Sequence, residues 1–76
     1  MTSLAVARTL DSAVVALKEQ AAHRAFEDLI VIALETGNVP GAKSRFAEAQ
    51  EVLNGESLDE LVEMARGDYG VELLEA

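Results

Sequence analysis

The pattern of apolar and polar positions is clearest between Ser12 and Glu35, where it follows the period of an α-helix. At about 100° per residue, the apolar side chains fall on one broad arc and most of the charged ones lie opposite. The arc holds Val14, Val15, Ala21, Ala22, Ala25, Phe26, Leu29, Ile32 and Ala33. Residues 2–10 are compatible with the same helix. The pattern therefore predicts one long amphipathic helix, over about residues 3–36, on which the rest of the chain packs.

A turn and a second helix follow this long helix. Gly37 can take the left-handed conformation that ends a helix, and Pro40 restricts Val39 to extended backbone. A narrow apolar stripe then repeats at spacings of four, three and four, formed by Ala42, Phe46, Ala49 and Leu53. It predicts a helix over about residues 41–53 that lies antiparallel on the first helix, with Phe46 as its main contact.

A third helix is predicted over about residues 58–66. We expect Asn54 and Gly55 to close the second helix, Ser57 and Glu60 to form a capping box for the third, and Gly67 to end it. Its apolar side consists of Leu58, Leu61, Val62 and Ala65. Residues 71–76 form a short tail. The predicted fold is therefore all-α, with a single domain over residues 1–76 in which two shorter helices fold back on a long one.

The segment from residue 29 to residue 34 is apolar all the way around the helix, which the surface helix of a monomer would not tolerate. A chain of 76 residues without cysteine also has few other ways to add buried area. We therefore predict a homodimeric helical bundle, because the small alanines of this helix let a second helix approach closely. The expected interface comprises Ala22, Ala25, Phe26, Leu29, Ile30 and Ala33.

The net charge of −8 is concentrated near the C-terminus. Acidic and basic residues balance up to residue 47, whereas residues 48–76 hold nine carboxylates against Arg66 alone. This distribution disfavours direct binding to a phosphate backbone and suits a basic protein partner. We expect a protein partner to contact Glu56, Asp59, Glu60, Glu63 and Tyr69.

Residues that carry chemistry are scarce. The chain has no cysteine nucleophile, one histidine and no catalytic motif, so we expect no catalytic residues, no cofactor and no enzymatic activity. Glu19, His23 and Glu27 share one ridge of the long helix, but their spacing differs from the Glu-x-x-His element of metal sites in helical bundles. We interpret these acids as solvated, with Arg24 paired to Glu27 or Asp28, and expect no metal.

Residues 55–59, with the sequence Gly-Glu-Ser-Leu-Asp, resemble the Asp-Ser-Leu attachment site of acyl carrier proteins, which are also small, acidic and helical. The resemblance implies a phosphopantetheine arm on Ser57. It covers only this pentapeptide and the acidic helix that follows it. The sequence departs from that family in having Glu56 before the serine and only 19 residues after it.

These observations favour a non-catalytic protein-protein interaction module, an acidic adaptor or an inhibitor of the kind that mobile elements encode. The alternative is an acidic mimic of nucleic acid that occupies the site of a DNA- or RNA-binding protein, and a carrier role is third. The longest apolar run has six residues and no basic segment precedes an apolar one at the start. We therefore expect a cytoplasmic protein without membrane association.

Overall fold

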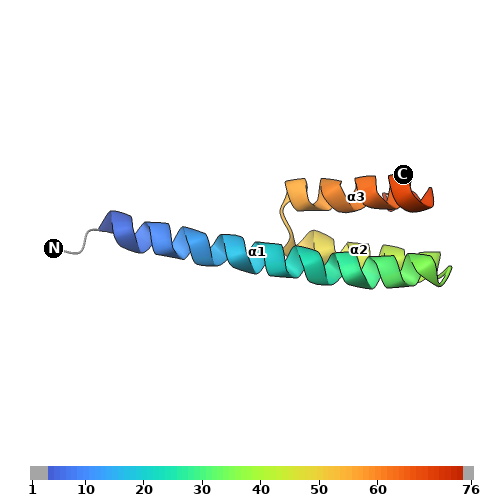
Figure 1. The fold of residues 1–76 in the computed structure, drawn as a ribbon, viewed down its shortest axis with the longest axis horizontal. Coiled ribbons are helices and arrows are strands. Elements are labelled where there is room, and N and C mark those ends of the chain that lie inside the picture. The colour runs from blue at the N-terminus through green and yellow to red at the C-terminus, as the bar shows by residue number, and fades with distance from the viewer. Residues whose placement is uncertain (1–3, 75–76) are drawn as a thin grey trace.

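The computed structural model describes the backbone of residues 4–74 and the side chains of residues 17–74. This part of the chain forms three helices and no strand: α1 (Leu4–Glu35), α2 (Val39–Val52) and α3 (Gly55–Tyr69). In Figure 1, α2 runs back beside the second part of α1, and α3 then runs in the same direction as α1. The all-α prediction is thus confirmed, whereas residue 3 and residues 75 and 76 lie outside the described residues.

The long helix α1 continues without interruption through Asp11 and Ser12. Its last residue is Glu35, and Gly37, two residues later, has a left-handed φ of 75°, as the sequence predicted. The Asn38 N–H donates to the Ala33 carbonyl at 2.8 Å and the Gly37 N–H donates to the Leu34 carbonyl at 3.1 Å. These two bonds form a Schellman motif, which satisfies carbonyls that the end of the helix would leave unpaired.

The molecule is elongated, with extents of 56 × 23 × 19 Å. Its radius of gyration is 15.6 Å, whereas a compact chain of this length would have about 11 Å. Figure 1 shows the reason, because the first part of α1 extends beyond the ends of α2 and α3. Only the second part of α1 is therefore covered by the rest of the chain.

The core is aliphatic and draws on all three helices. The buried residues are Ile30, Leu34, Ala42, Phe46, Ala49, Leu53, Leu61, Val62, Ala65 and Leu73. The stripe predicted for the second helix is confirmed, since all four of its members are buried. The apolar side predicted for the third helix is confirmed as well, with Leu58 partly buried beside the other three.

The side of α1 that faces the core differs from the predicted arc. Ile30 and Leu34 are buried against α2 and α3, whereas Ala21, Ala25 and Leu29 are exposed. Burial of large side chains removes more apolar area from water than burial of alanines. Because residues 29–34 are apolar on every side, the pattern left this choice open, and packing selected the side with the larger groups.

The start of α3 corrects a second expectation. The helix begins at Gly55 rather than at residue 58, and its N-cap is Asn54, whose side chain accepts a hydrogen bond from the Ser57 N–H at 2.9 Å. Ser57 therefore lies inside the first turn, and the predicted capping box is wrong. Asparagine caps as well as serine does, and Leu53 is already extended. The first suitable residue after α2 thus starts the helix.

The N-cap assignment predicts that substitution of Asn54 lowers the stability of the protein more than substitution of Ser57 does. We expect Asn54→Ala to lower the free energy of unfolding by about 1 kcal/mol, because the Ser57 N–H loses its acceptor. Ser57→Ala should change it by less than about 0.5 kcal/mol. Urea denaturation followed by circular dichroism measures both values at one protein concentration. A larger loss of unfolding free energy for Ser57→Ala than for Asn54→Ala would contradict the N-cap at Asn54 and support the capping box.

The end of α3 corrects a third expectation. Gly67 lies within the helix, and the left-handed residue that ends it is Gly70, with φ of 65°. The Gly70 N–H donates to the Arg66 carbonyl at 3.2 Å and the Val71 N–H donates to the Ala65 carbonyl at 3.0 Å. Residues 68 and 69 thus belong to the helix as well, because isolated glycines are tolerated inside helices when packing favours continuation.

Two glycine substitutions should therefore have opposite signs. A Cβ added at Gly67 meets no atom within 4 Å. Gly67→Ala should stabilise the protein by about 0.5 to 1 kcal/mol, because alanine is the better helix former. Gly70→Ala should destabilise it by about 1 kcal/mol, because an L-residue is strained at this φ. Thermal denaturation of the two variants compares them directly, and a stabilising Gly70→Ala would contradict the assigned helix end.

Candidate functional site

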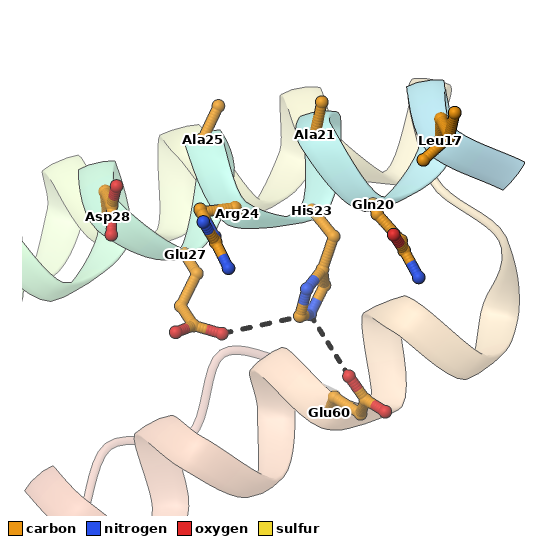
Figure 2. Close-up of a pocket in the computed structure, with 9 residues that line it drawn as sticks. All are labelled: Leu17, Gln20, Ala21, His23, Arg24, Ala25, Glu27, Asp28 and Glu60. Atoms are coloured by element: carbon orange, nitrogen blue, oxygen red, sulfur yellow. Dashed lines mark ion pairs between the residues drawn. The ribbon is translucent and has the colours of Figure 1, made fainter. Parts of the chain in front are cut away.

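His23 of α1 lies at the junction between α1 and α3 (Figure 2). Its Nε2 atom is 3.4 Å from Oε2 of Glu60 and 4.0 Å from Oε2 of Glu27. The side chain is only 18% exposed, and the buried Nε2 has no hydrogen-bond partner. A protonated imidazole here would face carboxylates from both helices. Glu60 is thus engaged with α1, although it belongs to the predicted partner-binding set.

An open pocket adjoins this junction, and most of its lining comes from α1. Figure 2 shows Ala21 and Ala25 pointing away from α3, while His23 and Glu27 point toward it. Arg24 and Asp28 also line the pocket. Neither forms an ion pair with any side chain that the structure describes, so the pairing predicted for Arg24 is absent.

The ridge of Glu19, His23 and Glu27 is used for packing between helices. The Glu19 carboxylate accepts a hydrogen bond at 2.8 Å from the backbone N–H of Asn54, in the link between α2 and α3. The expectation that Glu19 is merely solvated is therefore wrong, because the chain returns to this point only in three dimensions. Among residues 17–74, no group of three or more potential ligands is arranged to hold a metal ion.

Four carboxylates form what we call the acidic ridge of α3. Its members are Glu56, Asp59, Glu60 and Glu63. All four are exposed, and the opposite side of α3 carries Leu61, Val62 and Ala65 in the core. Glu63 lies 3.5 Å from Arg66, the one cation in this part of the sequence. The structure thus brings the predicted acidic residues together on a single rigid element.

Arg66 also holds the segment that follows α3. Its Nη2 atom donates to Oε1 of Glu72 at 2.8 Å, and its Nε atom donates to Oε2 at 3.0 Å. This bidentate hydrogen bond and the opposite charge raise the pKa of Arg66 and lower the pKa of Glu72. The pair therefore stabilises the folded state above the ordinary pKa of glutamate and is lost as the pH falls through the lowered pKa.

Tyr69 differs from the other predicted partner-binding residues, because it is half-buried and packs against the core. Its hydroxyl donates to Oε1 of Glu35 at 3.1 Å, which joins the end of α3 to the end of α1. Partial burial raises the pKa of the Tyr69 phenol, and the hydrogen bond to Glu35 and its charge raise it further. Tyr69, which the sequence placed among the partner-binding residues, thus covers part of the core in this structure.

The residues of the predicted dimer interface do not share one face in the structure, because some lie in or against the core and others are exposed. Ile30 is fully buried in the chain's own core, and Ala22, Phe26 and Ala33 pack against that core. Exposed apolar positions form a separate stripe, the outer face of α1, composed of Leu17, Ala21, Ala25, Leu29 and Ile32. Leu17 is 64% exposed and Ile32 is 60% exposed. Both were missing from the expected interface, although the spacing of four, four, four and three could have indicated them.

Beside this outer face lies a second pocket, where the end of α1 meets the start of α2. Leu29, Ile32 and Thr36 line it from the side of α1, with Gly41 and Ser44 across from them.

None of the helices within residues 4–74 combines the length and the apolar character needed to cross a membrane. No protein-family model matches the chain, and it has no match among the curated proteins or the solved structures compared with it.

Proposed function

We propose that this chain is a non-catalytic protein-protein interaction module, an acidic adaptor or inhibitor that acts as a homodimer. The observation that supports the proposal is the acidic ridge of α3, which presents four exposed carboxylates on a helix whose other side is fixed in the core. A basic protein surface is the complementary partner, because opposite potentials steer association and fix the orientation of a complex.

The position of the ridge also favours a binding role. Leu61 and Ala65 are fully buried, so α3 cannot rotate its carboxylates inward without exposing apolar area. The Glu60 carboxylate lies 3.4 Å from Nε2 of His23, so this member of the ridge is close to α1. A preorganised set of charges loses little entropy when a partner binds. The ridge is thus suited to present fixed charges to a folded protein.

Mimicry of nucleic acid remains the alternative function, and the spacing of the ridge favours it. From Glu56 to Glu63 the helix rises roughly 10 Å, so the mean axial spacing of the four carboxylates is about 3.5 Å, close to the 3.4 Å per phosphate of one DNA strand, although the individual steps are about 4.5, 1.5 and 4.5 Å. The ridge is nevertheless short, since one turn of DNA spans about 34 Å. We therefore favour contact with a compact basic patch on a partner protein over mimicry of nucleic acid.

The third candidate is the carrier role that residues 55–59 suggested. Ser57 is half-buried in the first turn of α3, where its N–H is bound by Asn54. Intact mass spectrometry of protein purified from its own cells tests this role, because a phosphopantetheine arm would add its mass to the chain.

The leading proposal is tested by charge reversal on the ridge. Asp59→Lys with Glu63→Lys changes two ridge carboxylates and leaves the His23 contact with Glu60 intact. Glu48→Lys with Glu51→Lys makes the same change in net charge on exposed positions of α2 and is the matched control. We expect a nuclease-treated pull-down from source-cell lysate to yield a protein that the ridge variant loses, by about tenfold or more, and the control retains.

Loss of the captured protein with both variants would mean that total charge alone decides binding. Retention with both variants would contradict binding through the acidic ridge. The captured protein also separates the two leading functions. A nucleic-acid-binding protein whose capture falls steeply between low and moderate salt supports mimicry, because screening acts on exposed charges. A partner that is insensitive to salt supports an apolar contact of an adaptor.

A further inference from the structure

The outer face of α1 is exposed over roughly four turns, and two of its neighbours, Arg24 and Asp28, have no ion-pair partner among the described residues. Both lie on the same edge of the stripe, one helical turn apart. We infer that this face binds a second copy of the chain in antiparallel orientation, with Ala21 of each copy opposite Ile32 of the other. The inference rests on the proposed function, which includes a homodimer, and specifies its geometry.

Side-chain size supports this register. A twofold axis between positions 26 and 27 places position 21 opposite position 32 and position 25 opposite position 28 or 29. Each small alanine of one copy then faces a larger side chain of the other, so that the surfaces can interlock. Rows of residues spaced by four pack in this way when helices cross. A parallel pair would set alanine against alanine and leave a gap.

The pocket at the start of α2 fits the same register. Position 17 falls opposite position 36, and Thr36 lines this pocket together with Leu29 and Ile32. The exposed Leu17 of the second copy would therefore reach a depression in which Leu29 and Ile32 lie beside polar groups, and the twofold symmetry would provide this contact twice. Burial of Leu17 against Leu29 and Ile32 would remove apolar area from water, which favours association.

Charge selects the orientation. In the antiparallel pair, Arg24 of each copy lies near Asp28 of the other, which gives two reciprocal ion pairs. A parallel pair would instead bring Arg24 to Arg24 and Asp28 to Asp28. Exposed pairs add little affinity but discriminate well between orientations.

Cysteine cross-linking tests the geometry, because the natural chain has no cysteine. Ala21→Cys and Ile32→Cys are single substitutions at exposed positions. We expect an equimolar mixture of the two variants to form a disulfide-linked heterodimer under mild oxidation, and each variant alone to remain mostly uncrosslinked. A parallel dimer would cross-link each variant with itself. An antiparallel dimer centred near residue 20 would cross-link Ala21→Cys alone, and either result would overturn the inference.

A charge exchange tests the same geometry without a covalent bond. Arg24→Asp and Asp28→Arg should each raise the dissociation constant of self-association by about tenfold, because like charges then face each other. Their mixture should associate as well as the natural protein, since every pair is again opposite in sign. Sedimentation equilibrium measures the three samples. A natural protein that sediments as an 8.1 kDa monomer would refute the homodimer itself, while leaving the ridge variants to decide partner binding separately.

Discussion

Phe46→Ala is expected to leave the protein largely unfolded at 37 °C. Phe46 is 3% exposed and is the largest side chain of the aliphatic core. Truncation of a buried phenylalanine costs about 3 to 5 kcal/mol. At about 0.05 to 0.15 kcal/mol per residue, a domain of this size has only roughly 4 to 11 kcal/mol of stability. The substitution therefore removes much of the margin by which the folded state exceeds the unfolded one.

The loss should appear in circular dichroism as a lower helical signal and a broad, early thermal transition. Val52→Ala is the matched control, because Val52 is on the same helix but exposed. It should change the free energy of unfolding by less than about 0.5 kcal/mol. If Phe46→Ala melts at the same temperature as Val52→Ala, α2 does not pack on α1 as described.

Leu73→Ala is expected to destabilise the protein by about 2 to 4 kcal/mol, although residue 73 follows the last helix. Leu73 is 5% exposed and belongs to the core, while its neighbour Leu74 is 49% exposed. Leu74→Ala is therefore an unusually close control and should be nearly neutral. Chemical denaturation at a fixed protein concentration compares the two, because self-association would make stability concentration-dependent.

The segment from residue 71 to residue 73 packs because two features hold it. The left-handed Gly70 turns the chain back, and the hydrogen bonds from Arg66 to Glu72 fix the residue beside Leu73. Equal losses at Leu73 and Leu74 would mean that this segment does not pack in solution. A loss confined to Leu73 would establish it as part of the core.

Periodicity predicted much of this fold. The stripe containing Phe46 and the left-handed Gly37 both follow from local sequence and are present in the structure. Local spacing fails where two local solutions compete. Asn54 and Ser57 are both good N-caps, and Gly67 and Gly70 both can end a helix, so tertiary packing decides between them.

Other features could not be predicted, because they join positions far apart in the sequence. The bond from the Asn54 N–H to Glu19 spans 35 positions, and the bond from Tyr69 to Glu35 spans 34. The acidic ridge was readable, since its members share one helix. The outer face of α1 was readable as a stripe but not as an exposed one, because a helix that is apolar on several sides does not reveal which side its own chain will cover.

The first part of α1, which extends beyond α2 and α3, sets a distance between the start of this helix and α3 (Figure 1). Residues 4–16 extend α1 by roughly 20 Å at 1.5 Å per residue, in line with its covered part. Whatever is attached at that end is held at a set distance from the carboxylates of α3, and a helix transmits this distance more rigidly than a flexible linker does. Lengthening or shortening α1 by whole turns would therefore change this distance without altering either end of the helix.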